Sequence, residues 1–352
     1  MMLLFNHKCL HFFLLIMKNP ETDRYSGERR RNLNIRNVQG GLKSCGNYFI
    51  MKFLDLYKKH QTKDIRAYLN EALHCIFFLG NIHTLKIKPA EFFTSNELLT
   101  LKRMFPDPFE KYATHLPSRT PFSILLDAIV QIKGSQNQNE VMDYLWTFLK
   151  DLKVPKPNTN TKKYWNHYTL EATVICICHN ERTGIQKPKN FYGASLSCKG
   201  KVEQEVIISL SCLETWNAAV AHAVCLADSG GAINLPQTVK CKAFKRKWGT
   251  GQYYGDPPCS KCITIFQGAS FEPCQLEAGK APTWPYGHCA ETESLSKLLN
   301  AEPALCQQVE ILNNATNLKR DNVVNNAKDR LVSLLGGKDF VLNGTEFQFF
   351  SP

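Results

Sequence analysis

The sequence has no apolar run long enough to cross a bilayer as a helix, which takes about 20 residues. The run CLHFFLLIM, at residues 9–17, has nine residues. It follows one lysine and one histidine instead of a basic cluster, and no small-residue cleavage site comes after it. We therefore expect an intracellular, cytoplasmic protein, with secretion as the alternative.

Other patterns are also missing from the sequence. It has no internal repeat and no long low-complexity tract, which excludes solenoids and repeat arrays. It has no glycine-rich phosphate-binding loop, no Ser-His-Asp arrangement and no His-Glu-x-x-His pattern. With 352 residues, of which 43% are hydrophobic and 21% charged, the chain has a globular composition. Its chemistry must therefore come from another group of residues.

Acidic residues are few compared with basic ones: 31 Asp and Glu stand against 43 Lys and Arg, a net charge of +12. This excess favours polyanionic partners such as a single-stranded nucleic acid. In residues 240–258, KCKAFKRKWGTGQYYGDPP, basic and aromatic side chains alternate, as in loops where cations follow phosphates and rings stack on bases. The candidate substrate-binding residues are Arg246, Trp248, Tyr253 and Tyr254. A charged edge strand followed by an ordinary loop is the alternative.

The hydrophobic pattern changes once along the chain. Apolar residues recur every three or four positions up to about residue 152, whereas short β-branched or aromatic runs alternate with helical segments after the polar stretch VPKPNTNTKK. We expect an α+β or α/β protein, with an N-terminal helical module followed by a C-terminal three-layer α/β/α-like domain. The expected parts are a disordered or leader-like extension at 1–50, the helical module at 51–153, a linker at 154–163 and an α/β domain at 164–352.

Several elements are expected in the second half of the chain. Residues 170–180 and 190–198 predict a β-hairpin with a long loop, and EVIISLS, at 205–211, predicts a third strand. Residues 211–228 predict a helix whose first turn has the capping-box spacing of Ser211 and Glu214. Residues 339–350 predict a terminal hairpin.

The chain has fourteen cysteines, and two short motifs contain the most informative ones. Most of the others lie in apolar runs, where a reduced thiol behaves as a small hydrophobic group. PPCSKC places Cys259 and Cys262 at a spacing that lets both thiolates face one metal ion. In WPYGHCAE, Cys289 and Glu291 are two residues apart at the start of a helix. One of them can bind a metal while the other reaches toward a bound water.

Together, HCAE and PCSKC resemble the zinc-dependent cytidine and nucleic-acid deaminase superfamily. The resemblance covers only these two motifs, within residues 256–300, and their order along the chain is reversed. It implies zinc as the cofactor, with Cys259, Cys262 and Cys289 as ligands and Glu291 as the catalytic proton carrier. It implies a deaminase-like hydrolase that acts on a nucleoside, a nucleobase or a single-stranded nucleic acid.

One alternative keeps the usual order of the family motifs. Cys212 and Glu214 also form a Cys-x-Glu pattern, and they precede the Cys-x-x-Cys pair. In that arrangement Cys212 would be the third ligand and Glu214 the proton carrier.

A second alternative is a closed, structural zinc site. The Cys-x-x-Cys pair, Cys274 and either His288 or Cys289 would supply four ligands, which leaves no position for water. Glu291 would then only be a favourable charge in the first turn of a helix. The protein would be a non-catalytic intracellular binding protein. A third alternative has no metal.

Overall fold

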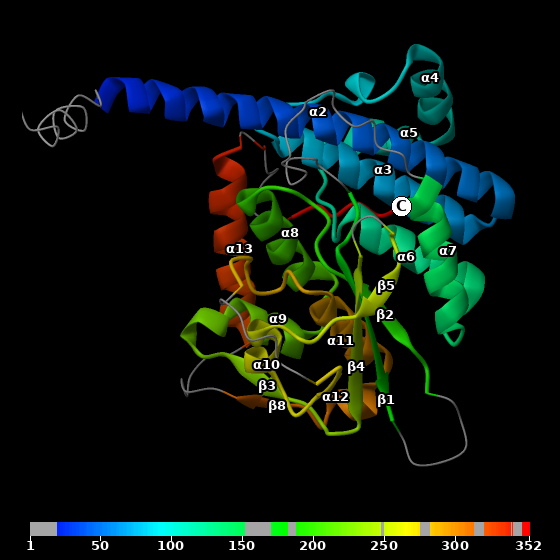
Figure 1. The fold of residues 1–352 in the computed structure, drawn as a ribbon, viewed down its shortest axis with the longest axis vertical. Coiled ribbons are helices and arrows are strands. Elements are labelled where there is room, and N and C mark those ends of the chain that lie inside the picture. The colour runs from blue at the N-terminus through cyan, green and yellow to red at the C-terminus, as the bar shows by residue number, and fades with distance from the viewer. Residues whose placement is uncertain are drawn as a thin grey trace, which may run out of the picture.

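The computed structural model describes residues 20–151, 170–181, 188–247, 250–274, 282–312, 320–338, 340 and 347–352. An N-terminal helical region is followed by a C-terminal region in which helices pack on mixed sheets (Figure 1). The expected mixed α/β fold is therefore confirmed. The expected linker at 154–163 and the turn of the expected terminal hairpin lie outside the described residues.

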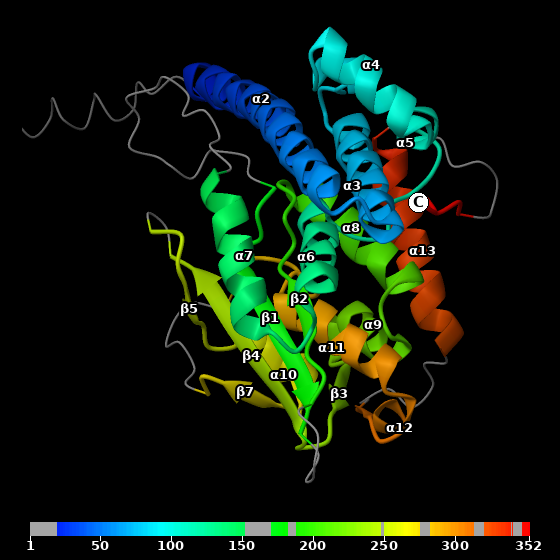
Figure 2. The ribbon, with the colours of Figure 1, turned by 90° about the vertical axis from the view of Figure 1, so that its right-hand side faces the viewer.

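Helices form the described part of the N-terminal region. The elements are α2 (Pro20–His60), α3 (Lys63–Ile82), η1 (Pro89–Glu91), α4 (Ser95–Met104), α5 (Pro106–Lys111), α6 (Pro121–Lys133) and α7 (Gln138–Asp151). Helix α2 lies along α3 in both views (Figures 1 and 2). The expected boundary at residue 51 falls inside α2, and residues 20–50 are helical. In the described parts of the chain, no helix is both long and apolar enough to span a bilayer.

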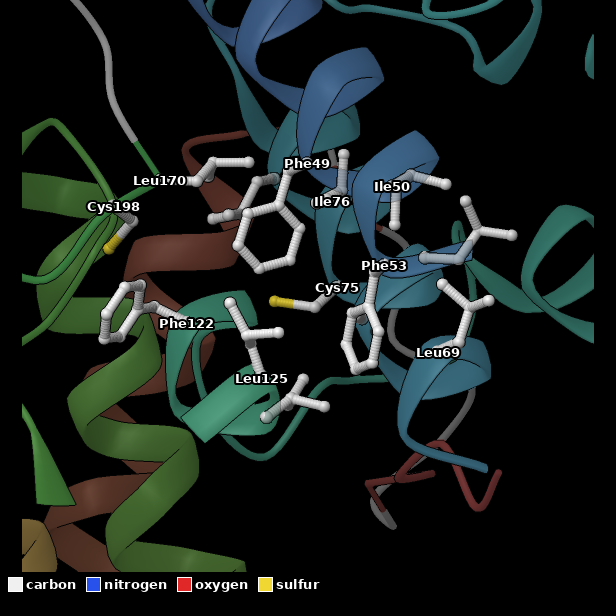
Figure 3. Close-up of a cluster of buried hydrophobic side chains, with 14 of the residues drawn as sticks. Phe49, Ile50, Phe53, Leu69, Cys75, Ile76, Phe122, Leu125, Leu170 and Cys198 are labelled. Atoms are coloured by element: carbon white, nitrogen blue, oxygen red, sulfur yellow. The ribbon is translucent and has the colours of Figure 1, made fainter. Parts of the chain in front are cut away.

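A large apolar core lies under α2, and it draws on both regions of the chain. Figure 3 shows Phe49 and Phe53 of α2 and Cys75 of α3 pointing toward one another and toward α6. Leu170 and Cys198, which flank the first two strands of the C-terminal region, complete the same cluster. Because both regions bury side chains in one core, each covers apolar surface of the other.

Two sheets form the C-terminal region. Their strands are β1 (Val174–Asn180), β2 (Phe191–Ala194), β3 (Ala232–Asn234), β4 (Val239–Arg246), β5 (Tyr253–Gly255), β6 (Phe266–Gln267), β7 (Ser270–Glu272) and β8 (Glu310–Leu312). One sheet has the order β2-β1-β4-β5, with β7 parallel to β4, and the other has the order β6-β3-β8. Strands β1 and β2 are antiparallel, so the hairpin expected from residues 170–198 is present.

Strand β1 separates two cores. Its sequence VICICHN alternates, and successive side chains of a strand point to opposite faces. Ile175 and Ile177 belong to the core shared with the N-terminal helices, whereas Cys176 and Cys178 belong to a second core on the other face. The second core is therefore lined with buried sulfur on the side where the candidate site lies.

The helices of the C-terminal region are α8 (Lys201–Glu214), α9 (Ala218–Cys225), η3 (Ala227–Ser229), α10 (Ser260–Ile265), α11 (Ala290–Ala301), α12 (Pro303–Cys306) and α13 (Arg320–Gly336). The expected strand at 205–211 is wrong, because these residues lie inside α8. Glu214 is the last residue of α8 and does not cap a helix, and the Ser211 hydroxyl donates to the Ser118 carbonyl at 2.8 Å. A short run of Val and Ile buried on all sides has the same pattern in a helix and in a strand.

Helix α11 packs directly on β1 and β2. Gly193 of β2 makes this close approach possible. A Cβ atom at Gly193 would lie 2.4 Å from both the Ala290 carbonyl oxygen and the Ser294 amide nitrogen. Any side chain there would push α11 away from the strand. The contact fixes the start of α11 against the sulfur-lined face of the sheet.

Candidate metal centre

Three cysteine side chains converge where α10 and α11 begin. The Cys259 sulfur lies 3.6 Å from that of Cys262 and 3.4 Å from that of Cys289. All three sulfur atoms lie within 4.8 Å of one another. We call Cys259, Cys262 and Cys289 the three-sulfur group. Within the described ranges, no fourth Cys, His, Asp or Glu ligand atom joins it.

The local fold explains how two distant motifs meet. Cys259 is the N-cap residue of α10 and Cys289 is the N-cap residue of α11, so both sulfurs lie at helix N-termini. Gly287 has φ of +87° and turns the chain into α11. A Cβ atom at Gly287 would also approach Trp216 at 3.0 Å. Glycine is therefore the residue that both the backbone conformation and the packing accept here.

The geometry of the three-sulfur group fits a zinc ion. Tetrahedral coordination with Zn–S bonds of about 2.3 Å sets the sulfur atoms about 3.8 Å apart. The separations of 3.4 and 3.6 Å are close to that value. Thiolates are ligands that zinc accepts readily. Three protein ligands leave one coordination position for a water molecule or a substrate atom.

The three thiols are electrostatically unequal. The hydrogen bonds that Cys259 shares with Cys262 and Cys289 lower the pKa of Cys259 to about 2 and raise the pKa of both partners. Cys259 is therefore the thiol of the group that loses its proton most readily. Backbone amides of the first turn of α10 also lower the pKa of Cys259. The group therefore carries a stabilised negative charge that favours a cation.

Glu291 lies beside the three-sulfur group in a dry environment. Only 4% of the residue is exposed. Burial raises the pKa of Glu291 to about 8, and the charges of Cys176 and Cys259 add to the increase, whereas a hydrogen bond with Cys262 opposes it. The carboxyl group thus contacts one sulfur of the group and lies near a second.

The other candidate ligands lie elsewhere. His288 does not belong to the three-sulfur group, and burial lowers its pKa to about 4. Its carbonyl oxygen accepts a hydrogen bond from the Leu196 amide at 3.0 Å, which ties the loop to the end of β2. Cys274 is exposed and outside the group. Cys212 is buried and shares a hydrogen bond with Cys225 instead.

The described candidate substrate-binding residues lie together on the β4–β5 strand pair, where Arg246 is opposite Tyr253 in register, and outside the three-sulfur group. Arg246 pairs with Glu171 and also donates to the Gly251 carbonyl at 3.3 Å, so it braces the end of β4. Tyr253 packs against the core that is shared with the N-terminal helices. Tyr254 is 47% exposed, and Trp248 lies outside the described residues.

The sequence prediction missed two neighbours of the three-sulfur group. The Trp284 indole nitrogen donates to the Cys289 sulfur at 3.2 Å. Cys176, on β1, is close enough to Glu291 to raise the pKa of its carboxyl group. The position of Trp284 in the motif WPYGHCAE was a usable signal. No signal in the sequence marked Cys176, because its strand-like surroundings resemble those of any buried cysteine.

Comparison of the chain with protein-family models, with curated proteins and with solved structures finds no match. The assignment of the site therefore depends on its own geometry.

Proposed function

We propose that this protein is a zinc-dependent hydrolase of the deaminase type, which releases ammonia from an amino-substituted nitrogen heterocycle of a nucleoside or nucleobase. The observation that carries the proposal is the convergence of Cys259, Cys262 and Cys289 within 4.8 Å of one another. The buried Glu291 carboxyl lies next to them. Three thiolates and one carboxyl group are the set that the resemblance to the deaminase superfamily implies.

Two features favour a catalytic site over a closed structural one. Cys274, the additional ligand of the structural alternative, is exposed and separate from the group. Cys259 and Cys289 are only half-buried, whereas Cys262 and Glu291 are buried. The group is thus partly open to solvent, while the carboxyl group beside it is buried. This arrangement suits a site that admits a substrate.

Each residue has a separate task in the proposed reaction. Cys259, Cys262 and Cys289 would hold the zinc ion, and at its remaining position the ion would supply a water molecule whose pKa is lowered toward neutrality. Glu291 would carry a proton from that water to the departing amine nitrogen. The positive charge of a bound ion beside Glu291 would favour the carboxylate form that this role needs. Because water is excluded around Glu291, its carboxyl group interacts strongly with nearby charge. The reaction consumes one water and releases one ammonia molecule.

The reversed order of the two motifs does not weaken the proposal. A metal site depends on where the ligands lie in space, and α10 and α11 bring both N-terminal ends together. Deaminase-type chemistry needs the positions of the sulfurs and the carboxyl group, and chain order does not enter into it.

The test is zinc content combined with an ammonia-release assay on cytidine, adenosine and a single-stranded oligonucleotide. We expect one zinc per chain and activity on at least one substrate. Glu291→Gln should keep the zinc and lose about 10²- to 10⁴-fold in rate, the usual contribution of a general acid–base group.

The matched control is Glu310→Gln, which neutralises an exposed carboxylate on β8 and should change neither zinc content nor rate. Zinc-loaded protein that is inactive on all three substrates would favour the structural alternative. Full activity of Glu291→Gln would exclude Glu291 as the proton carrier.

A further inference from the structure

Trp284 lies against the three-sulfur group without being one of its ligands. Its indole nitrogen donates to the Cys289 sulfur at 3.2 Å. Trp284 is nevertheless 38% exposed, which is unusual for a large aromatic side chain. One part of the indole thus contacts a ligand atom while another part faces solvent.

Neighbouring groups hold the Trp284 segment in place. The Lys261 ammonium donates to the Trp284 carbonyl oxygen at 2.5 Å and lies 4.6 Å from the centre of the Tyr286 ring. The His288 ring lies 5.9 Å from the Trp284 ring at an interplanar angle of 36°. Lys261 itself lies between Cys259 and Cys262 in the sequence. The segment that carries Trp284 is therefore fastened to the metal-binding loop.

The N–H contact acts on the Cys289 sulfur. A hydrogen bond to a thiolate withdraws electron density from the sulfur and fixes its orientation toward a metal. Outer contacts of this kind typically change metal affinity by about 10- to 100-fold. Trp284 is thus positioned to influence metal binding without coordinating the ion.

The exposed part of the ring suits a planar ligand. An indole is a large, rigid surface, and stacking of a base on an aromatic side chain contributes about 1–3 kcal/mol. A ring that stacks on Trp284 would lie beside Cys289, on the solvent-facing side of the three-sulfur group. Glu291, which is buried, contacts Cys262 of the same group.

We propose that Trp284 is a specificity-determining residue of the site, which stacks on the planar heterocycle of a nucleoside while its N–H group holds the Cys289 thiolate. The chemical class of the ligand rests on the proposed function. The hydrogen bond to Cys289 does not rest on it.

The test uses the full-length chain with two variants that separate the two roles. Trp284→Phe keeps an aromatic face but removes the N–H donor. It should lower zinc affinity about 10-fold or more in a chelator competition and shift the sulfur-to-cobalt charge-transfer band of the cobalt(II)-loaded protein.

Trp284→Leu removes the aromatic face as well as the N–H donor. Measured by calorimetry with cytidine and adenosine in the Glu291→Gln background, it should weaken binding of the better ligand about 5- to 150-fold.

Tyr48→Leu is the matched control, because Tyr48 is also 38% exposed but lies on α2. It should change neither the spectrum nor the affinities. An unchanged cobalt spectrum and zinc affinity in Trp284→Phe would overturn the hydrogen-bond role. Equal nucleoside binding by Trp284→Leu and the parent, or no nucleoside binding by the parent, would overturn the stacking role. Nucleoside binding without ammonia release would leave this inference intact and contradict only the proposed function.

Discussion

Glu291 and Glu293 have the same side chain and lie two positions apart on α11, yet their surroundings differ. Two residues along a helix are separated by about 200°, so they point in nearly opposite directions. Glu291 faces the three-sulfur group. Glu293 accepts hydrogen bonds from Ser123 and from the Ala194 amide and pairs with Lys297. Neighbours, and not residue type, make Glu291 the candidate for chemistry and Glu293 a structural anchor.

His74 predicts a pH dependence of stability. Its ring is buried and stacked on Phe350 at 4.0 Å, and burial lowers its pKa to about 3 from the usual 6.5. Between these values the unfolded chain binds a proton that the folded chain does not. Folding stability should therefore be fully present above about pH 6.5 and should fall as the pH drops, by about 1.4 kcal/mol per pH unit from this residue.

Urea unfolding at pH 7.5 and pH 5.5 measures this effect when the wild type is compared with His74→Phe. The variant cannot bind the proton, so its loss of stability between the two pH values should be smaller. Equal losses in both proteins would show that His74 is not the titrating group.

At the scale of residues, the sequence was most informative where chemistry restricts the choice. The Cys-x-x-Cys spacing predicted that Cys259 and Cys262 face one metal ion. The Cys-x-Glu pattern added Cys289 and Glu291 to the predicted site. The sequence could not decide whether His288 or Cys289 is the ligand, because adjacent residues at a helix start can each point toward or away from a site. Arg246 could not be recognised as a partner of Glu171, which lies far from it in the sequence.

Helix α11 is held in position by a network of charged groups on the side away from the three-sulfur group. Lys297 contacts Asp127 of α6 and Glu293, both at 2.7 Å. Arg119 continues the network. It pairs with Asp127, and its guanidinium lies 2.8 Å from the carboxylate of Glu71 on α3. The N-terminal helices therefore position the helix that carries Cys289.

Replacing Lys297 by Met should destabilise the protein. The change leaves Asp127 and Glu293 without this cation, and removing one partner of a fully buried pair costs roughly 3–5 kcal/mol. Because the Lys297 side chain is 26% exposed, we expect about 2 kcal/mol or more. Urea unfolding at pH 7.5 measures the change.

Lys201→Met is the control. The Lys201 side chain pairs with Glu205 and is 84% exposed, so this substitution should lower the free energy of unfolding by no more than about 0.5 kcal/mol. If Lys297→Met were as mild as Lys201→Met, the network would not anchor α11.

At the scale of elements, periodicity predicted the N-terminal helices and the β1–β2 hairpin. It failed at residues 205–211, where Val206, Ile207 and Ile208 lie in α8. These residues are buried between the core under α2 and the second core, so no polar face marks the helical period. Tertiary packing decided the conformation, and the local pattern carried no information about it.

The molecule as a whole is built around shared apolar packing. The core under α2 includes side chains from α3 and α6 together with Ile175 of β1 and Leu210 of α8. Strand β1 contributes to that core and to the second one. The sequence predicted a helical module and an α/β domain, but it could not predict that they share a core, because such contacts join residues far apart in the chain.

A shared core predicts that both regions unfold together. Hydrogen exchange followed by mass spectrometry, at increasing urea concentrations, can compare peptides from α3 with peptides from β1. Both should lose protection at the same urea concentration, since neither can keep its buried surface without the other. Loss of protection in α3 well before β1 would mean that the N-terminal helices are an independent unit.

The central claim is that three cysteines hold a zinc ion and leave one position open. Zinc K-edge X-ray absorption of the purified, zinc-loaded protein tests it most directly. We predict three sulfur neighbours at about 2.3 Å and one oxygen or nitrogen neighbour at about 2.0–2.2 Å. In Cys262→Ser the three-sulfur signal should be lost, whereas it should persist in Cys274→Ser. Four sulfur neighbours in the wild type, or a signal that depends on Cys274, would contradict an open three-cysteine site.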